Sequence, residues 1–424
     1  MACGPDSMFI SLKKNMTRLV ITLIVVLLID IYVFQAVRTV SDTAAPLVRK
    51  VIYSLYWGLS LFTLGTLLLA MFTHGTAPNH ARMQVANVLF IVFFSKLVIA
   101  VVLLLGDFVR VFQWLLYTLR GPGQTAHNAS RGKFLSQLAL IMGAIPLTTM
   151  IWGMVKGAFD YQVKKVTLRF PNLPPAFEGF RLLQITDLHT GSFGSAEPLE
   201  KAVALINKQA ADVVVFTGDL VNNVATEVEP YIPTLAKIKA PEGVYSILGN
   251  HDYGDYVQWS SAAARKQNLD ALKNAHRRIG WDLLLNEHRV LERNGQQIGL
   301  LGVENWGARM HFPKYGVMSK AYAGTEHLPV KILLSHDPSH WDGEVNVNYQ
   351  DIDLMLSGHT HGMQFGVNIP GVKWSPVQYV YKQWAGLYRK GKQFLYVNVG
   401  LGFLGYHGRV GFLPEITVFE FKRA

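Results

Sequence analysis

Five short polar motifs after residue 180 contain the residue types that bind metal ions. They are Asp-Leu-His, Gly-Asp, Gly-Asn-His-Asp, Ser-His-Asp-Pro and Gly-His-Thr-His, and they begin at residues 187, 218, 249, 335 and 358. Carboxylate, imidazole and amide groups suit a hard to borderline dication such as Mn, Zn, Fe or Mg. The chain has a single cysteine, Cys3, which excludes a disulfide within the chain and a Cys-based zinc or iron–sulfur site. The motifs therefore predict a cation site with oxygen and nitrogen ligands.

Each motif lies at the end of a short apolar run with the composition of a β-strand. The runs are residues 181–186, 212–217, 244–248, 330–335 and 352–357. The carboxyl ends of neighbouring strands converge in layered α/β folds, so five strand ends can build one pocket. In Asp-x-His and His-x-His the two side chains share a face of a strand. Glycines before Asp219, Asn250 and His359 let the backbone turn tightly there.

Chance is the main alternative for any one motif. A single Asp-x-His arises by chance, and an isolated histidine is more often an ordinary surface or core residue. Five motifs in order, each at the end of an apolar run, favour a metal site instead.

In this order the motifs resemble those of the calcineurin-like metallophosphoesterases. The resemblance covers roughly Val166 to the C-terminus. The segments DLHTG, SHDP, GHTHGMQ and PEITVF are most similar to the membrane-associated bacterial branch that includes the YkuE and YaeI phosphoesterases. The resemblance implies a four-layer αββα fold, in which two mixed sheets are flanked by helices. For the first 160 residues the sequence suggests no resemblance to a known family.

The resemblance also implies a role for each motif residue. The first metal ion would be held by Asp187, His189 and His361, and the second by Asn250, His336 and His359. Asp219 would bridge both ions. His251 would contact the phosphate and protonate the leaving oxygen, and Asp252 would orient His251. Many relatives have a further Asp three positions after the bridging Asp, where this chain has Asn222, which is not a usual ligand.

Two cations about 3.5–4 Å apart can clamp a phosphate and lower the pKa of a shared water. The resulting hydroxide would attack phosphorus in line with the leaving oxygen, while the ions offset charge on the equatorial oxygens. His251 can act as an acid only while it is free of metal. The expected cofactors are two divalent ions, with Mn, Fe, Zn and Mg left open.

Three further residues are candidates for substrate binding. Residues 400–405 spell GxGxxG, but the residues up to Pro414 do not resemble the helix that a dinucleotide site requires. A loop at the rim of the metal pocket is favoured, where His407 and Arg409 could reach an anionic substrate. Asn305-Trp306 follows the apolar run 298–303 on the ligand side and could shape the pocket, with a buried Trp in a loop as the alternative. The absence of GxxxxGK[ST], GxSxG and HExxH excludes a P-loop, the usual serine-hydrolase elbow and a zincin protease.

The composition indicates a membrane portion ahead of this domain. Hydrophobic residues make up 50% of the chain and charged residues only 16%, whereas soluble domains carry about a quarter charged residues. Four apolar stretches are each near the roughly 20 residues that cross a bilayer as a helix. They are residues 19–37, 51–72, 85–109 and 134–154. The first has no cleavage site and is expected to be a retained span rather than a signal peptide.

The pattern divides the chain into a transmembrane region at residues 1–160 and a catalytic domain at 161–424. Asp30 and Lys96 lie inside apolar stretches, where an ionisable residue either faces the bundle interior or has a function. In the second region, apolar runs first alternate with helical patterns and later follow one another closely. This order predicts an α/β layered domain with mixed sheets.

The formal net charge of +11 suits nucleic acid, anionic lipid or anionic substrate. No basic run is dense enough for a nucleic-acid-binding arm, and most basic residues near the apolar stretches are typical of membrane flanks. With the N-terminus inside, the inner segments hold eight Lys and Arg and the outer loops seven, so the side of the membrane on which the domain lies stays open.

We therefore expect an integral multi-pass protein of a bacterial cell (inner) membrane that hydrolyses a phosphomonoester, phosphodiester or pyrophosphate. Its partners would be the bilayer and a phosphorylated substrate, and tethering favours a lipid-linked or envelope substrate. A UDP-2,3-diacylglucosamine-type pyrophosphate hydrolase of lipid A synthesis is one alternative, because some relatives have that activity. A non-catalytic ligand-binding membrane protein is another. The natural substrate and the oligomeric state stay open.

Overall fold

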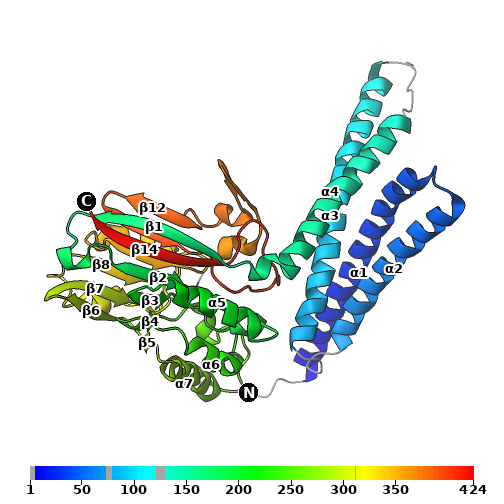
Figure 1. The fold of residues 1–424 in the computed structure, drawn as a ribbon. Coiled ribbons are helices and arrows are strands. Elements are labelled where there is room, and N and C mark those ends of the chain that lie inside the picture. Colours follow the sequence, from blue (N-terminus) through cyan, green and yellow to red (C-terminus); the bar gives the residue numbers. More distant parts are fainter. Residues whose placement is uncertain (1–4, 73–78, 121–128, 311) are drawn as a thin grey trace. The chain divides into compact units, whose positions relative to one another are not determined.

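The computed structural model of the protein describes residues 5–72, 79–120, 129–310 and 312–424 (Figure 1). The chain forms two compact units, Met1–Ile151 and Trp152–Ala424. The expected functional boundary between residues 160 and 161 stays a prediction.

The first unit consists of long apolar helices. They are α1 Pro5–Ser41, α2 Pro46–Phe72, α3 Asn79–Arg120 and α4 Ala129–Val155, whose last turn enters the second unit. Within the described residues, four segments are long and apolar enough to cross a membrane: Val20–Ser41, Pro46–Leu68, Met83–Leu116 and Ser130–Phe159. Large apolar side chains such as Leu55 and Phe108 are exposed on them, which is typical of helices that face lipid.

A buried ionic cluster lies inside this bundle. The Lys96 ammonium is 2.6 Å from Asp30 Oδ1 and donates to Ser60 Oγ at 2.8 Å. The Tyr56 hydroxyl donates to the Asp30 carbonyl oxygen at 2.7 Å. Asp30 is fully buried. Asp30 and Lys96 thus neutralise each other within the bundle.

The second unit contains two six-stranded mixed sheets. The first has the order β1-β14-β2-β3-β4-β5 and is parallel except between β14 and β2. Its strands are β1 Gln162–Phe170, β2 Arg181–Ile185, β3 Val213–Phe216, β4 Val244–Ser246, β5 Asp282–Leu283 and β14 Glu415–Arg423.

The second sheet has the order β12-β13-β9-β8-β7-β6, with antiparallel pairs only at its two edges. Its strands are β6 Glu287–Arg293, β7 Gln296–Gly302, β8 Lys331–Leu334, β9 Leu354–Ser357, β12 Gly386–Lys390 and β13 Gln393–Val397. A separate hairpin pairs β10 Val367–Ile369 with β11 Val372–Trp374.

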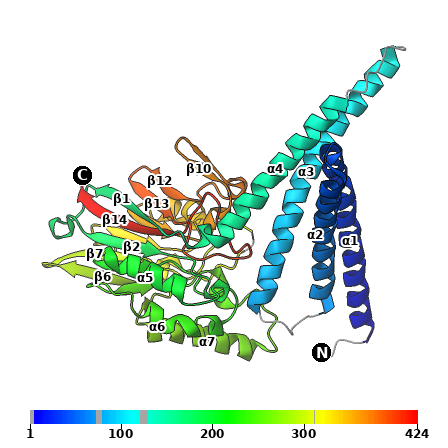
Figure 2. The same cartoon turned by 45° about the vertical axis from the view of Figure 1, so that its right-hand side comes forward.

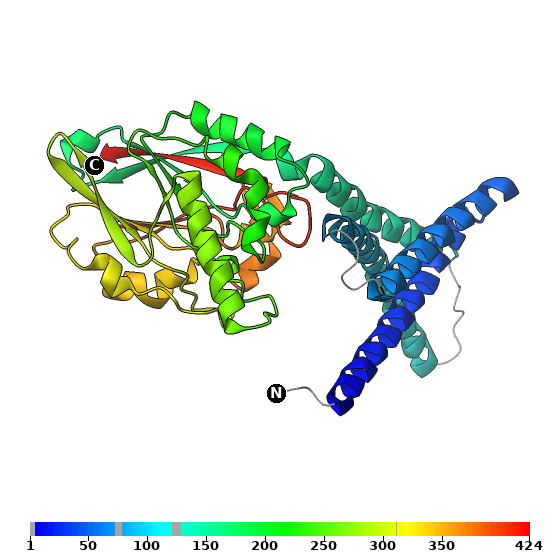
Figure 3. The same ribbon diagram turned by 90° about the horizontal axis from the view of Figure 1, so that it is seen from below.

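Helices cover the outer face of each sheet. They are α5 Glu197–Lys208, α6 Ile232–Leu235, α7 Ala262–Ile279, α8 Met318–Tyr322 and α9 Asn346–Asn348. Figure 1 shows α5, α6 and α7 along the first sheet, and in the view from below α7 lies in front of the strands (Figure 3). This arrangement is the expected four-layer αββα fold.

Alternating side chains on the central strands fill three cores. Leu182 and Val215 pack between the sheets with Ile332 and Leu354 of the second sheet. Leu183 and its alternating neighbours pack instead against α5 and α7, and the other face of the second sheet packs on α8 and the segment 341–345. Strands buried on both faces are continuously apolar, which explains why β3 reads Val-Val-Val-Phe.

Candidate metal centre

The motif residues converge into two adjacent groups of ligand atoms. One group is Asp187, His189 and His361, and the other is Asp219, His336 and His359. Within each group the ligand atoms lie within 4.8 Å of one another. The Asn250 side-chain oxygen is 3.2 Å from His336 Nε2 and 2.8 Å from His359 Nδ1, so it joins the second group.

The Asp219 carboxylate lies between the two groups. Its Oδ2 is 3.1 Å from His336 Nε2 of the second group and 3.6 Å from His189 Nε2 of the first. One carboxylate oxygen is therefore within reach of ligands from both groups.

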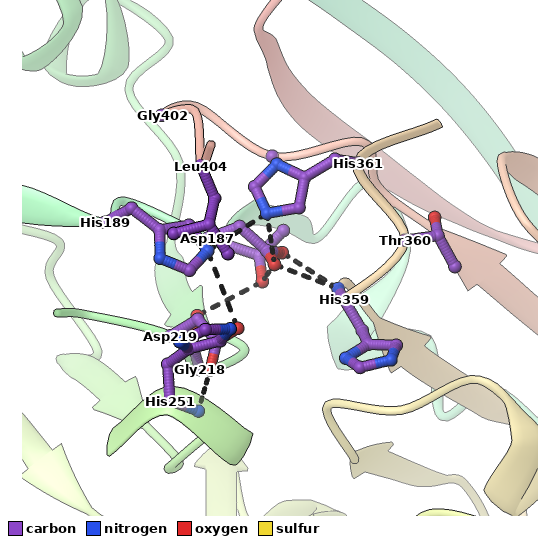
Figure 4. A network of polar contacts seen from close by, with 12 residues as sticks. Asp187, His189, Gly218, Asp219, His251, His359, Thr360, His361, Gly402 and Leu404 are labelled. Atoms are coloured by element: carbon purple, nitrogen blue, oxygen red, sulfur yellow. Dashed lines mark hydrogen bonds and ion pairs between the residues drawn. The ribbon is translucent and has the colours of Figure 1, made fainter. Parts of the chain in front are cut away.

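Ring nitrogens in this centre face one another directly. His189 Nε2 and His361 Nε2 are 3.0 Å apart, and His361 Nε2 is 3.2 Å from Asp187 Oδ1 (Figure 4). Two imidazole lone pairs and a carboxylate that point at one place are the donor set of a divalent cation. The residues present therefore fit the bound cations that the sequence analysis predicts.

Five strand ends position these side chains, as the sequence pattern predicts. Asp187, Asp219 and Asn250 follow β2, β3 and β4 of the first sheet, whereas His336 and His359 follow β8 and β9 of the second. The centre thus lies where the carboxyl ends of parallel strands from both sheets meet.

The backbone at the ligands is unusual. The φ angles of Asp187, His189, Asp219, His359 and His361 are +51°, +49°, +61°, +73° and +51°. Non-glycine residues rarely adopt this left-handed conformation, which costs about 1–2 kcal/mol per residue. Such strain concentrates at functional sites, because the surrounding structure holds the side chains where the chemistry needs them.

Glycines in the motifs allow close approach of backbone to carboxylates. A Cβ on Gly358 would lie 2.1 Å from Asp187 Oδ2, and one on Gly249 would lie 2.2 Å from Asp219 Oδ1. Gly218, at φ +98°, is the motif glycine that requires the left-handed conformation. The sequence predicts tight turns at all three glycines, but Gly249 and Gly358 mainly leave space for the carboxylates of Asp219 and Asp187.

Comparison with known proteins agrees with this geometry. Residues 180–363 match the family described as calcineurin-like phosphoesterase. Residues 16–158 match one described as probable calcineurin-like phosphoesterase, transmembrane domain. The chain is 31% identical over 340 residues to a Danio rerio protein named transmembrane protein with metallophosphoesterase domain, covering 78% of this chain and 73% of that protein. The chain belongs to the calcineurin-like phosphoesterase family.

Two bacterial relatives support the same assignment. The metallophosphoesterase YkuE of Bacillus subtilis (strain 168) is 32% identical over 261 residues, which are 60% of this chain and 84% of YkuE. The UDP-2,3-diacylglucosamine pyrophosphatase LpxG of Chlamydia trachomatis is 27% identical over 312 residues, which are 61% of this chain and 89% of LpxG. The predictions of family, fold and a metal-dependent phosphoesterase are confirmed. The first region, which the motifs did not identify, matches that transmembrane-domain family over residues 16–158.

Asp252 of this phosphoesterase does not hold His251 as expected. Its carboxylate accepts backbone N–H groups from Gly249, Asp219 and Leu220 at 2.8, 3.0 and 2.9 Å. It therefore ties the loop after β3 to the loop after β4. Burial, with the nearby Asp219 charge, raises the pKa of Asp252, and the backbone donors offset part of that cost.

His251 is held by the backbone instead. Its Nδ1 is 2.7 Å from the Asn222 carbonyl oxygen, and its own N–H donates to Asp219 Oδ1 at 2.9 Å. The ring lies against Tyr256 at a centroid distance of 4.6 Å and approaches His189 edge-on at 5.0 Å. A carbonyl accepts only, so Nδ1 carries a proton and Nε2 is the nitrogen that exchanges one.

Sequence reasoning missed three residues around His359. The Tyr381 hydroxyl lies 2.8 Å from His359 Nε2 and donates to Asp337 Oδ2 at 3.4 Å. Phe312 approaches the His359 ring edge-on at 4.8 Å. Asp337 follows His336 in its motif and could have been suspected, but Tyr381 and Phe312 lie in loops without a recognisable motif.

The three candidate substrate-binding residues lie inside the protein. Arg409 is fully buried, donates from Nε to the Gly402 carbonyl oxygen at 2.9 Å, and has Nη2 3.2 Å from His361 Nδ1. This geometry suits a residue that orients His361. Asn305 is also fully buried and donates to the Pro313 carbonyl oxygen, and His407 is 4% exposed. Direct substrate contact by these residues stays a prediction.

The glycine-rich loop at 400–405 lies beside the centre. The Gly402 N–H donates to the Asp187 carbonyl oxygen at 2.8 Å, and a Cβ on Gly402 would lie 1.9 Å from the Leu188 oxygen. The residues after it up to Pro414 form no helix, which agrees with the expectation of a loop rather than a dinucleotide site.

Electrostatics make the centre attractive to cations. Burial alone would raise the pKa of Asp187 and Asp219, but the surrounding histidines hold both below the usual range. Burial lowers the pKa of His189 to about 3. His336 is the exception, because Asp219 outweighs burial and raises its pKa to about 10. Two ionised carboxylates among buried imidazoles favour divalent cations over water.

Proposed function

We propose that the two ligand groups bind two divalent cations and that the enzyme hydrolyses a phosphate ester by in-line attack of water. The observation that supports two ions is the position of Asp219 Oδ2, within 3.6 Å of a histidine from each group. Asp187, His189 and His361 would hold one ion, Asn250, His336 and His359 the other, and Asp219 would bridge them. The identity of the ions stays open among Mn, Fe, Zn and Mg.

Bound cations would polarise the phosphate and lower the pKa of the attacking water. His251 would donate a proton from Nε2 to the leaving oxygen, while its Nδ1 proton stays on the Asn222 carbonyl oxygen. Asp252 would keep the loops of Asp219 and His251 together through the backbone. Tyr381 and Arg409 would orient His359 and His361 from outside the ligand groups.

The substrate that membrane tethering favours is lipid-linked or belongs to the cell envelope. A pyrophosphate hydrolase acting on a nucleotide-linked acyl sugar is a second candidate, favoured by the similarity to LpxG. We also propose that the protein lies in a bacterial cell (inner) membrane, in keeping with the similarity to YkuE. A C-terminal reporter fusion would fix the side of the membrane on which the catalytic unit lies.

Elemental analysis and turnover test the proposal. The purified chain should contain two transition-metal or magnesium ions and hydrolyse p-nitrophenyl phosphate or its bis ester. Chelation should abolish turnover, and added metal should restore it. One ion per chain, or unchanged turnover in His359→Ala, would contradict the two-ion centre.

A further inference from the structure

The β10–β11 hairpin carries an apolar face on which every side chain is exposed. The register pairs Val367 with Trp374 and Ile369 with Val372. Side chains alternate across a strand, so these four share one face. We call them the hairpin face: Val367, Ile369, Val372 and Trp374. Their exposed fractions are 42%, 59%, 50% and 36%, and the hairpin stands out from the sheets in Figure 2.

The opposite face of the hairpin is polar, and its side chains are also exposed. Lys373, which pairs with Asn368 there, donates to the Ala385 carbonyl oxygen and lies 4.7 Å over the Trp384 ring. The hairpin therefore presents its apolar face to the surroundings without burying it, and a contiguous exposed apolar surface is typical of an interaction site.

The surrounding chain has a one-sided charge. Between Asp353 and Glu415 the sequence has no acidic residue, and besides the buried Arg409 it has five basic ones: Lys373, Lys382, Arg389, Lys390 and Lys392. Lys382 and the aromatic Tyr379, which is 77% exposed, follow the hairpin closely. Trp and Tyr with adjacent Lys are typical of the membrane–water interface, and basic residues attract anionic headgroups.

Both ends of the hairpin are fixed to the metal centre. The preceding turn, His361–Gln364, begins with a ligand of the first group. The Ser375 hydroxyl donates to the Gly362 carbonyl oxygen at 2.8 Å, and the chain after the hairpin leads to Tyr381, which contacts His359. A surface that binds the hairpin face is therefore connected to the metal centre through both ends of the hairpin.

We propose that the hairpin face docks the catalytic unit onto the lipid bilayer, with anionic headgroups against the neighbouring lysines. The docked hairpin brings the metal centre to the phosphates of membrane lipids. Docking itself is independent of the proposed function, whereas delivery of a lipid-borne ester rests on it.

Fluorescence quenching in nanodiscs that hold one full-length chain tests docking without any turnover. The single cysteine makes this practicable: in a Cys3→Ser background, Ile369→Cys and Val372→Cys carry a bimane label. The matched control is Val290→Cys on β6, another exposed aliphatic residue, at 41%. Metal content of each variant checks folding.

Labels at positions 369 and 372 should be quenched by spin-labelled lipid and protected from aqueous iodide several-fold relative to position 290. Protection should increase with phosphatidylglycerol content, and it should decrease with salt and in Lys382→Gln. Equal iodide quenching at all three positions would overturn the proposal. Protection that appears only when two chains share a disc would overturn it in favour of a second copy as the partner.

A second measurement addresses delivery of the substrate. Ile369→Asp with Val372→Asp should reduce turnover of a vesicle-embedded phospholipid ester more than tenfold and leave turnover of a water-soluble p-nitrophenyl ester unchanged. An equal loss on both substrates would contradict delivery by docking. If the wild type hydrolyses neither substrate, the proposed function is wrong, but the quenching result still decides whether the hairpin docks.

Discussion

Each unit of the protein buries carboxylates, and the two units neutralise them in different ways. In the helical bundle, Asp30 is paired with the Lys96 ammonium at 2.6 Å. In the metal centre, Asp187 and Asp219 are surrounded by the ring nitrogens of four histidines. A carboxylate beside a fixed ammonium is already neutralised, whereas imidazoles can give up their protons and bind a cation together with the carboxylates beside them. The comparison teaches that a buried acid indicates a metal site when its partners are metal-ligand residues rather than counter-ions.

The sharpest test of this contrast replaces one acid in each unit. Asp219→Asn should lower kcat on a water-soluble ester by about 10³-fold or more, because it removes the charge that both ligand groups share. Asp30→Asn should leave the same kcat within twofold. Steady-state turnover in detergent measures both. Comparable losses in the two variants would mean that Asp30 contributes to the chemistry and would break the comparison.

The bundle pair should matter for stability instead. Lys96→Met leaves the Asp30 carboxylate buried without its counter-ion and should destabilise the bundle by about 3–5 kcal/mol. The double variant Asp30→Leu with Lys96→Met removes both charges and should recover most of that loss. Protease resistance and thermal unfolding in detergent measure the effect. A double variant as unstable as the single one would show that the ion pair does more than neutralise charge.

A smaller effect, on metal affinity, is expected when an added Cβ fills the space beside a metal ligand. In Gly358→Ala the new Cβ would lie 2.1 Å from Asp187 Oδ2, so the ligand must move. We expect metal affinity to fall by about 10–100-fold, as for other changes that displace a ligand. Gly391→Ala is the control, because it has a φ of +59° but nothing within 4 Å. Isothermal titration with Mn²⁺ measures both, and equal losses would contradict a steric effect of the new Cβ on Asp187.

For physical reasons, the sequence predicts well which residues converge at the metal centre and predicts poorly which residues contact them from outside. His189 and His361 were found because motif spacing at strand ends is local, and the fold brings strand ends together. Tyr381 and Arg409 could not be placed, because their contacts with His359 and His361 depend on loops that follow no periodicity. The family resemblance assigned Asp252 to His251, but its carboxylate turns back to the backbone of the preceding loop.

Another buried acid, Asp353, has no ion pair and no group of metal-ligand residues around it among the described residues. Its Oδ2 accepts the Lys331 backbone N–H at 2.9 Å, and burial raises its pKa from 3.8 to about 6. Because the folded pKa is the higher one, the stabilising contribution of the neutral acid is complete below pH 3.8 and is lost as pH rises through about 6. Asp353→Asn should therefore be more stable than the wild type at pH 8, by about 1–3 kcal/mol, and equal to it near pH 4.

Thermal unfolding of the catalytic unit across this pH range measures the difference, which should grow between pH 4 and 6 and then stay constant. Asn keeps an oxygen that can accept the Lys331 N–H, so the substitution changes charge with little change in packing. If the stability difference between Asp353→Asn and the wild type does not depend on pH, a partner neutralises Asp353, as Lys96 neutralises Asp30. For a buried acid with no such partner, the free-energy cost of burying the ionised carboxylate should instead appear above pH 6. The metal centre offsets the same cost by binding cations.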